Sequence, residues 1–195
     1  MKLIRNAASA ALIFSLIATA SATDSAALNG LRFGHDSRFL VDVAMDGRTW
    51  RLDDGSNPFY PTLTGNFRRG NSFIVSGKIY IANTLKSGGD FNQPNNPAGP
   101  DLPKAIGTWV CRGTFNFDFA DIANGAAPHV TSTQFFYFDD GTVLMSDGAE
   151  GGTATLRVVA GGTGRLRGAA GEVLETPLGV NDTNLFNVRF RFRIN

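Results

Sequence analysis

The sequence predicts an all-β protein, folded as a sandwich or a closed barrel, and three observations carry this prediction. Sixteen phenylalanines and 23 glycines occur without the i, i+3, i+4 apolar spacing of an amphipathic helix. Residues 186–194 alternate strictly between apolar side chains and Asn or Arg, as in a half-buried strand. Residues 158–173 place five glycines between two apolar runs, which is typical of two closely packed strands joined by a tight corner.

The first 22 residues predict a secretory signal peptide. Lys2 and Arg5 precede a run of small apolar residues, and Ala20-Ser21-Ala22 supplies a cleavage site. The apolar run is shorter than the roughly 20 residues that a membrane-spanning helix needs, so cleavage is favoured over anchoring. We therefore expect a signal peptide over residues 1–22 and one exported β domain over residues 23–195, secreted or periplasmic.

Composition limits the partners of this domain. The formal net charge of the whole chain is +1, and it falls to −1 once the two basic residues of the signal peptide are removed. We therefore expect neither a nucleic-acid partner nor a membrane partner. The single cysteine, Cys111, excludes an intramolecular disulfide. A buried apolar filler is the favoured role for it, with an intermolecular bridge or a reactive thiol as alternatives.

Two Asp-Gly pairs predict tight hairpins. The first joins residues 41–45 to 48–52 through Asp46-Gly47, and the second joins residues 134–139 to 142–145 through Asp140-Gly141. Together with these, about eight strands are expected, the others lying over residues 72–82, 106–117, 153–160, 171–175 and 186–194. A long irregular segment rich in Pro and Gly, Lys86 to Lys104, is either a plain surface connection or a functional rim.

Alternation also predicts which side chains point into the core. The apolar face of residues 106–117 and the apolar face of the terminal strand give six candidate ligand-binding residues: Trp109, Cys111, Phe115, Phe117, Phe190 and Phe192. Two alternatives remain open. These rings could simply fill the barrel, or Arg189, Arg191 and Arg193 could point inward toward an anionic ligand, which is disfavoured because buried arginine is costly unless paired.

The segment from Val159 to Val173, VAGGTGRLRGAAGEV, resembles the glycine corner of the allene oxide cyclase and dirigent superfamily, whose pattern is roughly V-x-G-G-[TS]-G-x-[FL]-x-G-x-x-G-x-V. The terminal strand, Asn187 to Phe192, is similar to the closing strand of that superfamily. Residues 77–80 and 106–115 are similar to exported bacterial members. The structural glycines of the corner are Gly161, Gly162, Gly164, Gly168 and Gly171.

This resemblance implies an eight-stranded antiparallel barrel with a central apolar cavity, assembled as a homotrimer or homodimer. It also implies that no metal and no organic cofactor is needed. Plant members cyclise an unstable fatty-acid epoxide or steer the coupling of phenoxy radicals, which is catalysis by orientation and exclusion of water. No catalytic residue is carried over, because the N-terminal half of this chain does not match the motifs of the cyclases.

Other motifs are weaker. Gly107-Thr108-Trp109 matches the G-x-W of lipocalins but lies too late in the chain to open a barrel. The two histidines, His35 and His129, lack partners at metal-binding spacing, so no metal site is expected. Cys111 with His129 remains open as a thiol nucleophile pair. Asn181-Asp182-Thr183 is either a glycosylation sequon or a turn before the last strand.

Three functions are compatible with the sequence. The first is an exported barrel that binds a small apolar or aromatic molecule and guides its cyclisation or coupling. The second is a cofactor-independent cyclase or isomerase with its own carboxylate in the cavity, for which Glu172 and Asp118 are the candidates. The third is a secreted structural or protein-interaction module, with a filled barrel and the Lys86–Lys104 segment as its contact surface.

Overall fold

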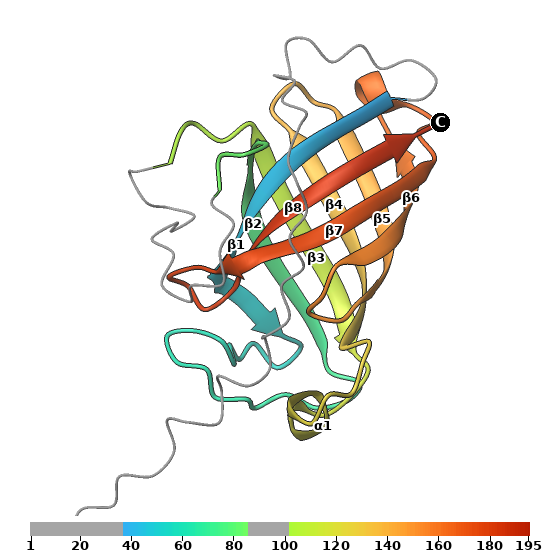
Figure 1. Ribbon diagram of the computed structural model, residues 1–195. Coiled ribbons are helices and arrows are strands. Elements are labelled where there is room, and N and C mark those ends of the chain that lie inside the picture. The colour runs from blue at the N-terminus through green and yellow to red at the C-terminus, as the bar shows by residue number, and fades with distance from the viewer. Residues whose placement is uncertain (1–36, 86–101) are drawn as a thin grey trace, which may run out of the picture.

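The computed structural model describes residues 37–85 and 102–195, and these form one closed antiparallel barrel whose strands are paired in sequence order (Figure 1). The expected signal peptide, His35 and most of the Lys86–Lys104 segment lie outside the described residues. The elements are β1 (Ser37–Leu52), β2 (Ser72–Ile81), β3 (Gly107–Phe115), α1 (Phe119–Ala123), β4 (Val130–Phe138), β5 (Val143–Glu150), β6 (Thr155–Gly162), the 3-10 turn η3 (Gly164–Leu166), β7 (Gly171–Val180) and β8 (Phe186–Ile194). Within the described ranges, no helix has the length and apolar character required to cross a bilayer.

The barrel closes because β8 pairs with both β7 and β1. Phe190 lies opposite Val41 of β1, and Phe192 lies opposite Val173 of β7. Strand patterns alone did not distinguish a sandwich from a closed barrel. The eight-stranded antiparallel barrel implied by the family resemblance is confirmed. The second predicted hairpin is also confirmed, since β4 and β5 are joined through Asp140-Gly141.

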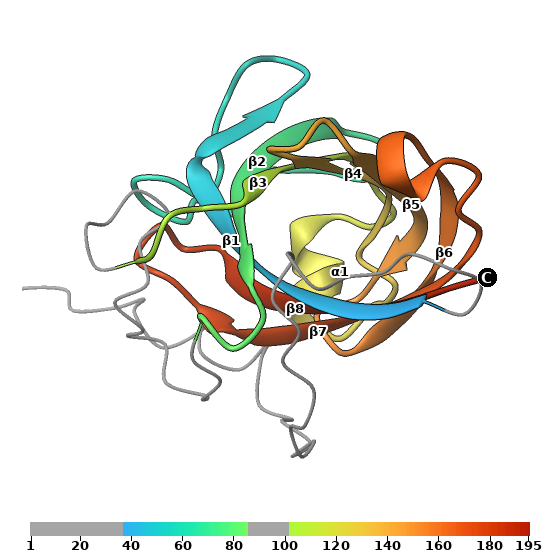
Figure 2. The same ribbon diagram turned by 90° about the horizontal axis from the view of Figure 1, so that it is seen from above.

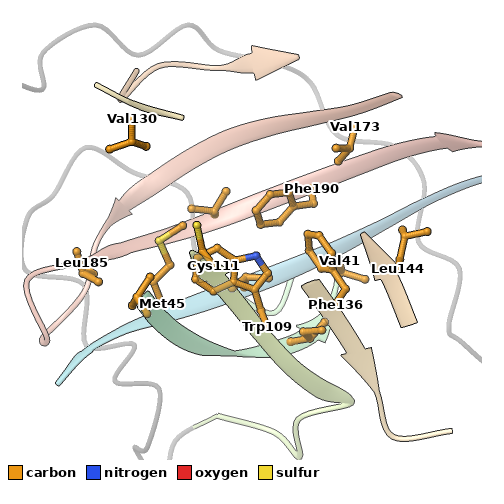
Figure 3. Packing of buried hydrophobic residues seen from close by; sticks show 14 of the residues in the cluster. Val41, Met45, Trp109, Cys111, Val130, Phe136, Leu144, Val173, Leu185 and Phe190 are labelled. Atoms are coloured by element: carbon orange, nitrogen blue, oxygen red, sulfur yellow. The ribbon is translucent and has the colours of Figure 1, made fainter. Parts of the chain in front are cut away.

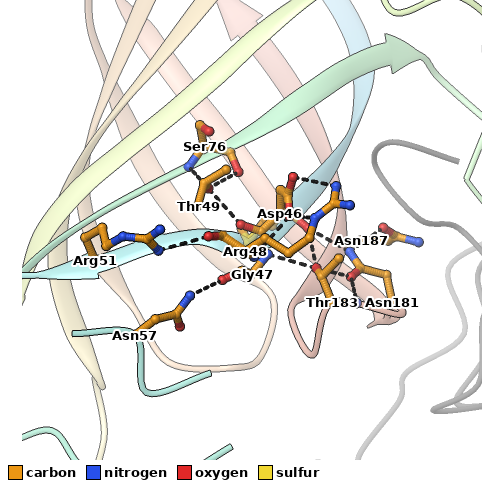
Figure 4. Close-up of polar contacts among 11 residues, drawn as sticks. Asp46, Gly47, Arg48, Thr49, Arg51, Asn57, Ser76, Asn181, Thr183 and Asn187 are labelled. Atoms are coloured by element: carbon orange, nitrogen blue, oxygen red, sulfur yellow. Dashed lines mark hydrogen bonds and ion pairs between the residues drawn. The ribbon is translucent and has the colours of Figure 1, made fainter. Parts of the chain in front are cut away.

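The first predicted hairpin is wrong. β1 runs through Asp46-Gly47 as one strand of 16 residues, and its pairing with β2 shifts register between Asp46 and Arg51, as at a β-bulge. The Gly47 N–H donates to Thr183 Oγ1 at 2.8 Å, and a Cβ on Gly47 would lie 1.9 Å from the Thr183 carbonyl oxygen (Figure 4). The glycine is required for this close approach of the β7–β8 loop, and not for a turn.

The same loop contains the sequon. Asn181 is buried, and its Nδ2 donates to the Met45 carbonyl oxygen at 2.8 Å and to Asn187 Oδ1 at 3.2 Å (Figure 4). The Thr183 hydroxyl donates to Asn181 Oδ1 at 2.6 Å. These side chains therefore form a turn before β8 that fastens the loop to β1.

The glycine corner predicted from residues 158–173 is confirmed as a strand, a tight corner and a second strand. β6 ends at Gly162, η3 follows, and β7 begins at Gly171. Gly171 has a φ of +149°, and a Cβ there would lie 2.1 Å from the Arg193 carbonyl oxygen. Only glycine permits this contact between β7 and β8.

Aromatic side chains fill the end of the barrel beside the glycine corner. Phe136 meets Phe190 and Phe192 edge to face at centroid distances of 5.0 and 5.1 Å, and all three side chains are fully buried (Figure 3). Leu144 and Val173 complete this packing. One end of the barrel is therefore a filled core, which we call the closed end.

The arginines of β8 lie on the outer face. Arg191 and Arg193 are exposed. Arg189 forms an ion pair with the buried Asp42, with 2.8 Å between Nε and Oδ1. The alternative in which these arginines point inward toward an anionic ligand is therefore wrong, as the cost of burying arginine suggests.

Candidate functional site

Four loops form the opposite end of the barrel, which we call the open end: residues 53–71, residues 116–129 with α1, residues 151–154 and residues 181–185. Figure 1 shows α1 at this end of the barrel, and in Figure 2, which looks along the barrel, α1 lies within the ring of strands. Hydrogen bonds join the loops to each other and to β1. Asn57 Nδ2 donates to the Gly47 carbonyl oxygen at 2.7 Å, and Asn184 Nδ2 donates to the Phe59 carbonyl oxygen at 3.0 Å. The loops therefore hold a fixed arrangement at the open end.

An aromatic cavity lies beneath these loops. Phe67 stacks on Phe115 at a centroid distance of 3.9 Å, and Trp50 stacks on Phe73 at 4.5 Å. The cavity volume is about 180 Å³, and its aromatic lining comprises Trp50, Phe59, Phe67, Phe73, Trp109, Phe115, Phe119 and Phe186. An apolar cavity of about 150 Å³ in a protein core is large enough to bind benzene. This cavity is therefore large enough for a small aromatic molecule.

Two carboxyl groups interrupt the apolar lining. Glu150, at the end of β5, and Glu175, on β7, both line the cavity. The side-chain amide of Gln134 on β4 lies between them, and its Nε2 donates to Glu150 Oε1 at 3.0 Å and to Glu175 Oε2 at 2.9 Å. Ser132 also donates to Glu150 through its hydroxyl group. The two carboxyl groups are thus held in place by side chains of β4, which pairs with β5 but not with β7.

Arg157 on β6 lies behind the two carboxyl groups and is fully buried. Its Nη1 donates to Glu150 Oε1 at 3.0 Å, its Nη2 donates to the Ser132 carbonyl oxygen at 2.8 Å, and its Nε lies 3.8 Å from Glu175 Oε2. The guanidinium does not reach the cavity surface, because it is not among the lining residues. The Arg157 guanidinium therefore stabilises the carboxyl groups but does not contact a ligand in the cavity.

Burial, together with the neighbouring Glu150, raises the pKa of Glu175 to about 8. Arg157 and Gln134 oppose this shift without cancelling it. Glu175 therefore carries its proton at neutral pH and can donate it, while lying in a cleft beside a second carboxyl group. A shifted carboxyl beside another one is a common arrangement in acid–base sites.

Three of the six predicted ligand-binding residues line this cavity: Trp109, Cys111 and Phe115. Phe190 and Phe192 point inward, as predicted, but they fill the closed end. Phe117 follows β3 and packs, partly buried, against the core. The role of all six residues in ligand binding stays a prediction.

Cys111 and His129 both line the cavity, but the Cys111 thiol is not prepared for nucleophilic chemistry. Burial raises the pKa of the Cys111 thiol well above its ordinary value, so the group stays protonated. Burial also lowers the pKa of His129. The Cys111 sulfur lies 3.8 Å from Glu150 Oε1, within a weak hydrogen bond. This environment favours a buried filler over a reactive thiol.

The two carboxylates proposed from the sequence are wrong. Glu172 is exposed, because on β7 the residues that face inward are Val173 and Glu175. Asp118 is exposed and accepts a hydrogen bond from the Arg69 backbone N–H at 2.7 Å, outside the cavity lining. The signal that could have found Glu175 is a polar residue in phase with inward apolar ones, and Gln134 and Arg157 show the same pattern beside Phe136 and Val159.

The closed barrel, its strand order and its glycine corner define a dirigent-like barrel. The pterocarpan synthase dirigent protein PsPTS1 matches with a TM-score of 0.52 and 13% identity over 81% of this chain and 92% of that chain. The pterocarpan synthase dirigent protein GePTS1 matches with a TM-score of 0.51 and 11% identity over 84% and 87%. A pyocyanin demethylase gives a TM-score of 0.49 and 13% identity over 81% and 99%. No family model and no curated protein matches the sequence.

Proposed function

We propose that this barrel binds a small apolar or aromatic molecule at its open end and promotes its cyclisation or isomerisation by proton transfer. The observation that carries the proposal is Glu175, a buried carboxyl group that keeps its proton at neutral pH and lines an aromatic cavity beside Glu150. The likeness to dirigent barrels supports a fold suited to holding such a molecule.

The chemistry follows from the two carboxyl groups. Glu175 donates its proton to an oxygen of the substrate, and Glu150 accepts a proton from a carbon of the rearranged skeleton. One proton is added and one is removed, so an isomerisation balances without an oxidant or a reductant. A positioned acid and base typically contribute a factor of about 10² to 10⁴ to the rate. The aromatic walls exclude water and restrict the substrate to one conformation.

The charge of the cavity favours a ligand without a carboxylate. Of the described residues that line it, none is Lys or Arg, whereas two are Glu. The nearest cation, Arg157, is engaged by Glu150 and by the Ser132 carbonyl oxygen. An anionic ligand would therefore meet carboxyl groups with no cation to compensate for its desolvation, so a neutral ligand is expected.

We further propose that the chain is exported, cleaved before Thr23 and assembled as a homotrimer or homodimer. Native mass spectrometry of protein purified from the exported fraction of its own host tests this together with binding. The expected spectrum shows an oligomer of chains that begin at Thr23, each releasing one neutral compound on gentle denaturation. A full-length monomer would contradict export and assembly, and an empty barrel would count against stable binding.

Turnover is tested with the compound that co-purifies and its products. Glu175→Gln keeps the size of the side chain and removes its acidic proton, so we expect turnover to fall by about 10² or more. Glu172→Gln is the matched control on the same strand, because this side chain is exposed on the outer face, and it should leave turnover unchanged. Equal turnover by both variants would overturn the role of Glu175.

A further inference from the structure

The two indole N–H groups of the chain have no hydrogen-bond partner within residues 37–85 and 102–195. Trp50 and Trp109 are the only tryptophans, and both line the cavity. Trp50 is 7% exposed and Trp109 is 1% exposed. Both Nε1 atoms are buried, and neither has a hydrogen-bond partner among the described residues. Figure 3 shows Trp109 inside the barrel, near Cys111.

Such groups require an explanation, because buried N–H donors are nearly always paired. A buried donor without a partner destabilises a protein by about 1–3 kcal/mol. Phe73 stacks on Trp50 and Phe59 packs against it at a tilt, and neither ring offers an acceptor atom. One oxygen of each cavity carboxyl group, Glu150 Oε1 and Glu175 Oε2, accepts from Gln134, and neither carboxyl group accepts from an indole N–H. The remaining place for an acceptor is the cavity itself.

The two donors lie at different depths. Trp50 packs against Phe59, which belongs to the loop over residues 53–71 at the open end. Trp109 pairs across the sheet with Phe136, which belongs to the closed end. A molecule in the cavity therefore passes one donor near the loops and meets the second near the floor.

We infer that Trp50 and Trp109 bind the ligand through their indole N–H groups, and that the ligand is an uncharged aromatic molecule bearing acceptor oxygens such as carbonyl or ether groups. This inference rests on the proposed binding function and assigns the polar contacts that orient the ligand. The aromatic walls hold its ring. The two indole N–H groups favour a ligand whose ring carries hydrogen-bond acceptors, because a ligand without acceptors leaves both N–H groups unpaired.

Two probes of nearly equal shape test this inference. Acetophenone carries a carbonyl oxygen, and ethylbenzene carries a methylene group in its place. The full chain labelled with ¹⁵N has two indole N–H signals, which Trp50→Phe and Trp109→Phe assign individually. We expect acetophenone to move at least one indole proton downfield, as hydrogen bonding does, and ethylbenzene to leave that proton without a downfield shift.

Affinity gives a second readout. We expect the ratio of the two dissociation constants to favour acetophenone, and Trp→Phe at the responding position to reduce this preference about fivefold or more. Phe73→Leu is the control, because it alters the apolar wall without touching an N–H group, and it should weaken both probes alike. Benzoate, a carboxylate of similar size, should bind more weakly than acetophenone.

The outcomes separate the inference from the function on which it rests. If both probes bind equally and shift the indole signals alike, the tryptophan donors are overturned while binding in the cavity stands. If neither probe binds at millimolar concentration, both the inference and the proposed binding function are overturned. The wild-type spectra decide the first case even if one variant fails to fold.

Discussion

At the scale of single residues, the site depends on which charges the fold allows inside the barrel. Arg157 and Glu150 form an ion pair. Burial and the nearby Glu150 raise the pKa of Glu175 and keep this carboxyl group protonated at neutral pH, against the opposing effect of Arg157. Breaking a buried pair by removing one member leaves an uncompensated charge. The polar residues of the cavity should therefore control stability and its pH dependence as much as they control chemistry.

We expect Glu175→Gln to remove a pH dependence from the free energy of unfolding. The pKa of this carboxyl rises from 4.5 to about 8 on folding, so between these values the folded chain keeps a proton that the unfolded chain has released. The stabilisation present below pH 4.5 is therefore lost as the pH rises through 8, with a slope of up to about 1.4 kcal/mol per pH unit.

Urea titrations at several pH values between these limits measure this slope for the wild type and the variant. The contribution of His129 to the free energy of unfolding has the opposite pH dependence. Burial lowers the pKa of His129, so folding is disfavoured when the ring becomes charged at low pH. Its contribution cancels in the difference between the two proteins. Glu172→Gln should keep the wild-type slope, and identical slopes for wild type and Glu175→Gln would disprove the raised pKa.

We expect Arg157→Met to destabilise the barrel by about 3–5 kcal/mol, because Glu150, whose side chain is only 19% exposed, then lacks its cationic partner. The double variant Arg157→Met with Glu150→Gln also removes the unpaired carboxylate charge and should therefore recover part of the lost stability. The midpoint of chemical denaturation provides the measurement. A single variant as stable as the wild type would show that the pair is exposed to water in solution.

At the scale of elements, the sequence was informative wherever the deciding contacts are local. The Asp140-Gly141 hairpin depends on neighbouring residues, the glycines of the corner all lie within one segment of the chain, and both elements are predicted correctly. Asp46-Gly47 carries the same turn signature, yet its partner is Thr183, 136 positions away. Local sequence cannot distinguish a turn from a bulge that a distant loop requires.

We expect Gly171→Ala to destabilise the glycine corner by about 2 kcal/mol or more, because the added Cβ meets the Arg193 carbonyl oxygen and the positive φ is strained. Gly161→Ala is the matched control in the same corner. A Cβ there has nothing within 4 Å, so its effect should stay within about 0.5 kcal/mol. Thermal denaturation of the two variants compares them, and equal losses would contradict this account of the corner.

At the scale of the whole molecule, the barrel divides into a closed end that supplies stability and an open end that supplies the cavity. The sequence predicted inward aromatic faces but offered a filled barrel or a cavity as alternatives, and the structure contains both, one at each end. Alternation along each strand marks Gln134, Arg157 and Glu175 as inward-facing, but their grouping could not be predicted, because they lie on three strands whose register only the closed barrel fixes.

This division predicts that stability and ligand affinity respond to different substitutions. Phe192→Leu should lower the free energy of unfolding while leaving the affinity for a small aromatic probe nearly unchanged, because this ring packs in the closed end. Phe67→Leu should weaken binding, since this ring lines the cavity and stacks on Phe115. Denaturation and probe titration of both variants measure the two effects, and weaker binding by Phe192→Leu would contradict the division.

The buried turn at Asn181 has a consequence for the order of events in biosynthesis. Attachment of an oligosaccharide requires the Asn181 side-chain nitrogen, and this nitrogen is inside the folded protein, bound to the Met45 carbonyl oxygen. A sugar can therefore be attached only before the β7–β8 loop docks, and once attached it prevents docking. In a host that glycosylates such sequons, the fraction of chains modified at Asn181 would measure how often glycosylation occurs before the β7–β8 loop docks.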